Sequence, residues 1–289
     1  MLRAIIKTLR IKQWTKNAIV FAALVFDRQL TNPESFGRTL AGFFLFCILS
    51  STVYIINDIM DVEADRMHPK KKFRPIASGQ LSIPTAITIA VIFLIITFSL
   101  AYLLSPSFLI IAALYFATNL AYSIKLKHIV LIDVVVLSLG FVFRVGAGVS
   151  LIQVERFSPW LYVVTYLLAL YLGFTKRRSE LALLTTGAGS HRKVLDGYTI
   201  PFLDQIIAMI SSITIMAYSL YTFSAPNLPA NHSMMLTIPF VVYGLLRYLY
   251  LLQIDGVTSP PDEIALVDRP LQAAIGLWGI SVLVIFYLF

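Results

Sequence analysis

The chain has 289 residues, of which 58% are hydrophobic and only 13% are charged. A soluble domain is typically about 25% charged and about 45–50% apolar. The composition therefore excludes a soluble globular enzyme, a disordered chain and a disulfide-stapled secreted domain, and it predicts an all-α polytopic membrane protein. The net charge of +8 must then be explained by where the basic residues stand, because the bilayer interior disfavours scattered charge.

A surface helix is predicted ahead of the first apolar segment. Apolar and basic residues alternate there at helical spacing: Leu2, Ile5, Ile6 and Leu9 among Arg3, Lys7 and Arg10. This pattern is typical of an amphipathic helix that lies in the membrane interface, and we expect one within residues 1–13.

Nine apolar segments approach the length of about 20 residues that spans a bilayer. They are about 14–31, 36–57, 84–104, 107–123, 129–151, 158–175, 201–224, 234–253 and 271–289. The first is the weakest, because its apolar core covers only 18–26; a signal peptide is the alternative there, but no small-residue cleavage site follows. We expect nine transmembrane helices in one domain over 1–289.

The basic residues predict the orientation of the chain. Eighteen of the 23 lie before the apolar core of the first segment or in the loops after the second, fourth, sixth and eighth segments. By the positive-inside rule, the N-terminus and these loops are cytoplasmic, and an odd number of spans puts the C-terminus outside. We therefore expect the chemistry on the cytoplasmic face.

The second segment ends in an acidic motif. If the helix continues, Asn57, Asp58, Asp61 and Asp65 share an arc of about 100°. Like charges at this spacing repel one another unless a cation neutralises them. Oxygen ligands without His or Cys suit Mg²⁺, which also bridges to phosphate oxygens. We expect Asn57, Asp61 and Asp65 to bind Mg²⁺ or Mn²⁺ and Asp58 to complete the catalytic set; a solvated acidic helix end is the alternative.

Two basic stretches follow the second and sixth segments. The first contains Lys72 and Arg74, and the second begins with Lys176, Arg177 and Arg178. Both are suited to phosphate recognition, and both also fit simple anchoring to anionic lipid or the orientation signal. In the second stretch, Lys176 and Glu180 are also spaced to pair with each other along a helix.

Two ionisable residues fall inside the fifth segment. Asp133 and Arg144 lie on one face, separated by a rise of about 16 Å, too far for a direct pair. Asp133 stands near the cytoplasmic end, where it joins the expected site. Arg144 is deeper, and the sequence leaves open whether it satisfies backbone carbonyls or binds substrate.

The pattern Asn57-x-x-x-Asp61-x-x-x-Asp65, followed by a basic loop with Arg74-Pro75 and Gly79, resembles the first aspartate-rich motif of the UbiA-type membrane prenyltransferases. The resemblance implies helices around a central cavity that opens to the cytoplasmic face. It also implies that a diphosphate substrate binds through Mg²⁺.

The stretch 176–180 departs from that pattern, because the second motif of the usual family member is acidic. Together with 13–17, 141–144, 191–198 and 261–269, it is similar to the decaprenyl-phosphate phosphoribosyltransferase branch. That likeness implies a bacterial plasma-membrane enzyme. It would transfer 5-phosphoribose from phosphoribosyl pyrophosphate (PRPP) to a polyprenyl phosphate, with release of pyrophosphate. The substrate-binding residues expected are Lys16, Lys72, Arg74, Tyr122, Lys125, Asp133, Lys176, Arg177, Glu180 and Arg192.

Other functions remain as alternatives. The first is a prenyltransferase that uses a prenyl diphosphate and an aromatic acceptor of the quinone or haem type. A transporter or channel is disfavoured, because its ionisable groups would gather at the bilayer midplane. A purely structural membrane protein leaves the acidic motif without a reason. No nucleic-acid partner is expected, and the oligomeric state is left open.

Overall fold

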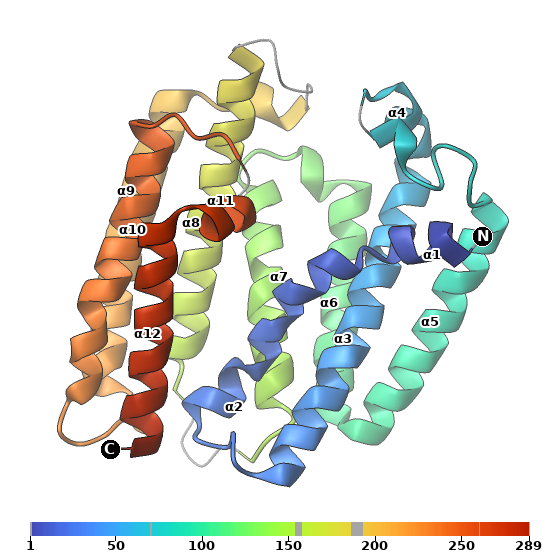
Figure 1. Cartoon of the computed structure of the whole chain (residues 1–289). Coiled ribbons are helices and arrows are strands. Elements are labelled where there is room, and N and C mark those ends of the chain that lie inside the picture. The colour runs from blue at the N-terminus through green and yellow to red at the C-terminus, as the bar shows by residue number, and fades with distance from the viewer. Residues whose placement is uncertain (1, 70, 154–157, 186–192, 260, 289) are drawn as a thin grey trace. The chain divides into compact units, whose positions relative to one another are not determined.

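The computed structural model describes residues 2–69, 71–153, 158–185, 193–259 and 261–288, and these residues form helices and no strands (Figure 1). The α-helices are α1 (Leu2–Leu9), α2 (Ala22–Phe26), α3 (Pro33–Met60), α4 (Val62–Met67), α5 (Ile83–Leu104), α6 (Pro106–Ile124), α7 (Ile132–Val149), α8 (Trp160–Thr185), α9 (Ile200–Ser224), α10 (Ile238–Gln253), α11 (Pro261–Val267) and α12 (Arg269–Leu288). The 3₁₀ helices are η1 (Ile11–Phe21), η2 (Lys71–Phe73), η3 (Leu126–His128), η4 (Lys193–Gly197) and η5 (Ser233–Thr237).

Seven helical segments of the described chain are long and apolar enough to cross a membrane: α3, α5, α6, α7, α9, η5 with α10, and α12. The prediction of an all-α integral membrane protein is therefore confirmed. The count of nine spans is not confirmed. The first expected segment forms the 3₁₀ helix η1 and the short α2 instead of one long α-helix. The sixth forms α8, which continues beyond the apolar segment through the charged stretch 176–180.

Side-chain caps define the starts of the long helices. The Asn32 side chain accepts hydrogen bonds from the backbone N–H groups of Glu34 and Ser35 at the start of α3. Ser82, Ser105 and Thr199 cap α5, α6 and α9 in the same way. A proline occupies the first turn of each of these helices, where its missing N–H leaves no bond unmade.

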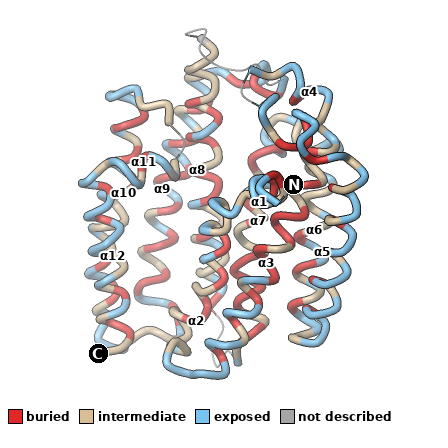
Figure 2. Tube along the Cα trace, turned by 45° about the vertical axis from the view of Figure 1, so that its right-hand side comes forward, coloured by how far each residue is buried: buried red, intermediate tan, exposed pale blue. Residues whose placement is uncertain are grey.

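The helices group into two compact units. The first consists of Met1–Val25, Gln29–Lys127 and Gly140–Val154. Within it, α3 packs against α1, η1, α5 and α6. Its core includes Phe46, Leu49, Phe108 and Tyr115. The outward side of α5 is apolar and exposed (Figure 2), as lipid contact requires, with Ile87, Val91 and Ile95 among its exposed residues.

The second unit consists of Phe26–Arg28, His128–Leu139 and Glu155–Phe289. Within it, α8 packs along α9, and α10 packs along α12. Its core includes Tyr171, Leu203, Ile207 and Tyr248. Helix α7 contributes its first residues to this unit and its later residues to the first unit.

Gly148 marks a close approach of two backbones in the first unit. A Cβ atom at this position of α7 would overlap the backbone carbonyl oxygen of Val20 in η1. Backbone cannot yield as a flexible side chain does, so only glycine lets η1 lie this close to α7. Small residues serve this purpose between membrane helices in general.

Substitution Gly148→Ala should therefore lower the stability of the folded chain by about 1–3 kcal/mol, the usual cost of overpacking. Thermal unfolding of the purified protein in detergent measures this. Gly276→Ala in α12 is the matched control, because its Cβ would meet no atom within 4 Å. Equal unfolding temperatures for the two variants would contradict the assigned contact.

Candidate active site

The acidic motif lies where α3 gives way to α4. Helix α3 ends at Met60, and Asp61 leaves the helical conformation with φ −94° and ψ 8°. The backbone nevertheless keeps helical spacing, because Asp61 N–H donates to Asn57 O (2.9 Å) and Asp65 N–H donates to Asp61 O (2.8 Å). The motif residues therefore follow one another at one-turn intervals, as the sequence predicts, across a break in the helix.

Two of the carboxylates are buried and share one arginine. Asp58 and Asp65 are each only 2% exposed. The Nη1 atom of Arg74 donates to Asp58 Oδ1 (3.0 Å) and to Asp65 Oδ2 (2.6 Å). A second arginine, Arg10, donates from Nη2 to Asp58 Oδ1 (2.5 Å). The two guanidinium groups balance the two buried charges.

Asp61 has a different environment. One of its oxygens accepts a hydrogen bond from Asn57 Nδ2 (3.1 Å). The other forms an ion pair with Lys127 Nζ (2.6 Å). Its side chain is 30% exposed, so it is the carboxylate of this group that solvent reaches. Lys127, which lies in η3, was not predicted as a site residue; its only signal was its place in the same basic loop as Lys125.

The donor set fits a magnesium ion that is shared with a substrate. Among the described residues, no group of three or more Asp, Glu, His or Cys side chains lies close enough to hold a metal alone. Mg²⁺ commonly uses one or two carboxylates and completes its shell with water and phosphate oxygens. Asn57 and Asp61 are neighbouring side chains that carry oxygens of that kind, with the amide nitrogen of Asn57 facing Asp61, and Asp65 stands one turn further on.

The other predicted site residues of the first unit come from separate parts of the sequence and differ in how exposed their side chains are. Lys16 in η1 and Tyr122 in α6 are half-buried. Lys72 and Lys125 are exposed, and neither forms an ion pair within the described chain. They are therefore available to anions.

A second polar cluster lies in the second unit around Asp133, which is fully buried at the start of α7. Arg177 Nε donates to Asp133 Oδ2 (2.6 Å), and its Nη1 donates to Glu180 Oε2 (2.6 Å). The Tyr198 hydroxyl donates to Asp133 Oδ1 (2.8 Å) and accepts from Leu131 N–H (2.7 Å). Burial raises the pKa of Tyr198, so its hydroxyl keeps the proton that it donates.

Two of the three basic residues at 176–178 form ion pairs within the second unit. Arg177 is only 2% exposed and serves two carboxylates, while Arg178 pairs with Asp204 (2.5 Å). Lys176 is exposed and makes no ion pair in the described chain. Glu180 pairs with Arg177 (2.6 Å) and not with Lys176, the partner that the helical spacing suggested. Arg192 lies outside the described residues.

Arg144 is a structural residue of the first unit. Its guanidinium donates to Asn17 Oδ1 (2.7 Å), Gly140 O (2.8 Å) and Tyr115 Oη (3.0 Å). It is 7% exposed, so these bonds tie η1, α6 and α7 together inside the unit. Of the two roles left open for Arg144, the contacts favour the structural one.

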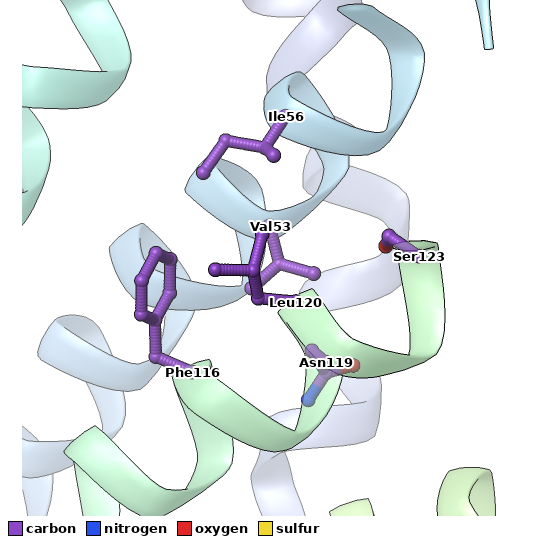
Figure 3. A pocket seen from close by; sticks show the side chains of 6 residues that line it. All are labelled: Val53, Ile56, Phe116, Asn119, Leu120 and Ser123. Atoms are coloured by element: carbon purple, nitrogen blue, oxygen red, sulfur yellow. The ribbon is translucent and has the colours of Figure 1, made fainter. Parts of the chain in front are cut away.

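Helices α3 and α6 leave only a shallow hollow between them, which does not enclose space for a water molecule (Figure 3). Its lining consists of Val53, Ile56, Phe116, Asn119, Leu120 and Ser123. None of these side chains carries a charge, so the hollow offers no positive charge to neutralise a phosphate. One of its lining residues, Ile56, directly precedes Asn57 of the acidic motif in the sequence.

Comparison with known proteins gives consistent results. Residues 18–262 match the UbiA prenyltransferase family. The decaprenyl-phosphate phosphoribosyltransferase of Mycobacterium tuberculosis is 31% identical over 283 residues, which cover 96% of this chain and 92% of the relative. That of Corynebacterium glutamicum is 31% identical over 98% of this chain and 86% of the relative. A UbiA homologue from Archaeoglobus fulgidus, solved with GPP and Mg²⁺, matches in fold with a TM-score of 0.75 and 18% identity, over 98% of this chain and 99% of that chain.

The Asp133 cluster predicts a large stability effect. Asp133→Ala leaves the buried Nε of Arg177 and the hydroxyl of Tyr198 without their shared acceptor, so the free energy of unfolding should fall by about 3–5 kcal/mol. Asp204→Asn, at a pair that solvent partly screens, should cost at most about 1 kcal/mol. Denaturation of both variants in detergent, followed by circular dichroism, provides the comparison; similar losses would refute the assigned difference.

Proposed function

Since the chain belongs to the UbiA prenyltransferase family of membrane enzymes, we propose that this transferase moves 5-phosphoribose from PRPP to a polyprenyl phosphate. Pyrophosphate leaves, and the reaction depends on Mg²⁺. The relatives named for this activity support the proposal, because the alignment with the M. tuberculosis enzyme covers 96% of this chain.

The observation that carries the proposal is the way Arg74 is held. Its Nη1 is fixed by Asp58 and Asp65, whereas its Nε and Nη2 atoms have no hydrogen-bond partner in the described chain. This leaves one edge of a guanidinium fork for a phosphate, next in space to the oxygen donors of the acidic motif. A cationic fork beside metal-binding oxygens is what a diphosphate requires.

The preference for PRPP over a prenyl diphosphate rests on positive charge. A phosphoribosyl transfer site binds a diphosphate, a 5-phosphate and a lipid phosphate, so it needs more cations than a site for one diphosphate. Lys72, Lys125 and Lys176 are exposed and without ion pairs among the described residues. With Lys16 and Arg192, they are the residues we assign to the additional phosphates.

In the proposed mechanism, Asn57, Asp61 and Asp65 would hold Mg²⁺, and the bound ion would supply positive charge against the leaving pyrophosphate, a contribution of several kcal/mol. Arg74 binds the same group and orients it. Lys127 leaves Asp61 and becomes available to a phosphate oxygen.

An oxygen of the polyprenyl phosphate forms a bond to the anomeric carbon as the bond from that carbon to pyrophosphate breaks. The acceptor is already an anion, so no general base has to remove a proton. In-line displacement inverts the α donor to a β product.

The apolar helices keep the lipid tail in the bilayer while its phosphate reaches the site. The proposed placement is the bacterial plasma membrane, with the N-terminus and the acidic motif cytoplasmic and the C-terminus outside. The orientation is inferred from the distribution of basic residues, and the bacterial membrane from the bacterial source of the named relatives. The acidic motif then faces the compartment that contains soluble PRPP.

The second candidate is a prenyltransferase that joins a prenyl diphosphate to an aromatic acceptor. The Archaeoglobus homologue of the same fold was solved with GPP and Mg²⁺, which favours a diphosphate donor of that kind. Membranes containing the protein, incubated with labelled PRPP or with labelled prenyl diphosphate, separate the two functions. Only PRPP should label a lipid product, and labelling from prenyl diphosphate alone would overturn the proposal.

Substitution Asp61→Asn should lower phosphoribosyl transfer by about 100-fold or more, because it removes the exposed anionic ligand of the metal. The matched control is Glu63→Gln: Glu63 is exposed, lies off the motif face and pairs with Arg66. Transfer is measured with labelled PRPP in detergent with Mg²⁺. Near-normal transfer by Asp61→Asn would count against the site.

Removal of divalent metal tests the cofactor separately. Transfer should stop when EDTA is added and return with excess Mg²⁺, and Mn²⁺ should substitute because it takes the same oxygen ligands. As a control, the protein should stay folded in EDTA, because Arg10, Arg74 and Lys127 already neutralise the acidic motif. Undiminished transfer in EDTA would exclude the metal-dependent mechanism.

A further inference from the structure

The N-terminal helix α1 packs directly on the elements that bear the acidic motif. Its own residues Ala4 and Thr8 are buried. Ile5 and Leu9 pack against a cluster of buried residues from α3, α5 and the loop before α5: Ile55, Ile76, Leu81, Ala86 and Ala90. Leu2 and Ile6 remain exposed beside Arg3 and Lys7, as the predicted interfacial helix requires.

Arg10 stands at the junction of α1 and η1 in an unusual conformation. Its φ is 52°, in the left-handed region that residues other than glycine seldom adopt. Hydrogen bonds from Arg10 N–H to Lys7 O (3.3 Å) and from Gln13 N–H to Arg10 O (2.7 Å) fix the turn. The side chain lies over the Tyr54 ring, 4.7 Å from its centroid, and reaches Asp58 Oδ1. The strained junction thus points a cation at the motif.

The charge balance shows what Arg10 contributes. Asp58 and Asp65 are both buried, and Arg74 is shared between them. Without Arg10, one guanidinium would face two buried carboxylates, and an unbalanced buried charge is strongly unfavourable. Arg74 would be drawn toward Asp58, and its hold on Asp65 would weaken. Arg10 therefore shares the neutralisation of Asp58 with Arg74, although it stands far from it in sequence.

A second contact ties α1 to the same region. Lys7 Nζ donates to the backbone carbonyl of Phe73 (3.0 Å), the residue that precedes Arg74. Helix α1 therefore holds the acidic motif through Arg10 and the basic loop through Lys7. These two elements supply the metal ligands and the guanidinium of the proposed donor site.

We propose that Arg10 is a positioning residue that latches α1 onto Asp58 and thereby fixes Arg74 and Asp65 for the donor diphosphate. Asp58 then acts as the anchor of this latch and not as a metal ligand. The latch stands on the contacts alone, and its effect on transfer rests on the proposed function.

Cysteine labelling tests the latch independently of any enzymatic activity. In a Cys47→Ser background, Thr8→Cys places a thiol in the buried face of α1, where Thr8 is 2% exposed. Arg10→Gln and Asp58→Asn should each raise the rate of labelling by a maleimide about ten-fold, because a hydrogen bond between charged groups is lost. The double variant should add little to either single change, since both remove the same contact.

Arg3→Gln is the matched control for charge, because Arg3 is exposed on the same helix and forms no ion pair in the described chain. It should leave the labelling rate unchanged. Equal rates for Arg10→Gln and Arg3→Gln, or additive effects of Arg10→Gln and Asp58→Asn, would overturn the latch.

The consequence for the reaction is measured on the full chain with labelled PRPP. Arg10→Gln should lower kcat/KM for PRPP about 10- to 100-fold and raise the Mg²⁺ concentration needed for half-maximal rate, as the loss of supporting contacts does. Arg10→Lys should recover part of the loss, and Arg3→Gln should behave as the unchanged protein. Normal kinetics for Arg10→Gln would refute the positioning role; absence of phosphoribosyl transfer by the unchanged protein would instead refute the proposed function, and labelling would still decide the latch.

Discussion

Buried carboxylates at the end of a membrane helix must be neutralised, and this constraint organises the first unit. Asp58 and Asp65 are 2% exposed, and an isolated charge at such a depth would be prohibitively unfavourable. The chain meets the requirement with cations from outside α3: Arg10 after α1 and Arg74 after η2. The N-terminal helix and the basic loop are therefore held at the acidic motif by charge as well as by apolar packing.

The two units solve the same problem differently. In the second unit, Asp133 is neutralised by Arg177 and by a hydrogen bond from Tyr198, which closes the cluster to solvent. In the first unit, Asp61 remains partly exposed and is paired with one lysine, Lys127. A closed cluster suits structural support, whereas an exposed carboxylate with a displaceable partner suits binding of a metal and its phosphate ligand. This contrast is why we place the chemistry at Asp61.

Composition and apolar length were enough to predict an all-α membrane protein, and the one-turn spacing of the acidic motif was also predictable. The first expected span was predicted as one continuous helix, but η1 is a 3₁₀ helix held by Asn17 and by the approach of Gly148. The partners of the carboxylates were not predictable. Arg10 meets Asp58 across 48 residues and Lys127 meets Asp61 across 66, and such pairings depend on how the helices pack, which residue spacing does not encode.

The most direct test is a structure of the protein with PRPP and Mg²⁺ bound. The account predicts the metal on the oxygens of Asn57, Asp61 and Asp65, the pyrophosphate on the unpartnered edge of Arg74, and Lys127 withdrawn from Asp61. It also predicts that Asp58 still binds Arg10. PRPP bound away from the acidic motif, with the Asp61–Lys127 pair intact, would contradict the central claim.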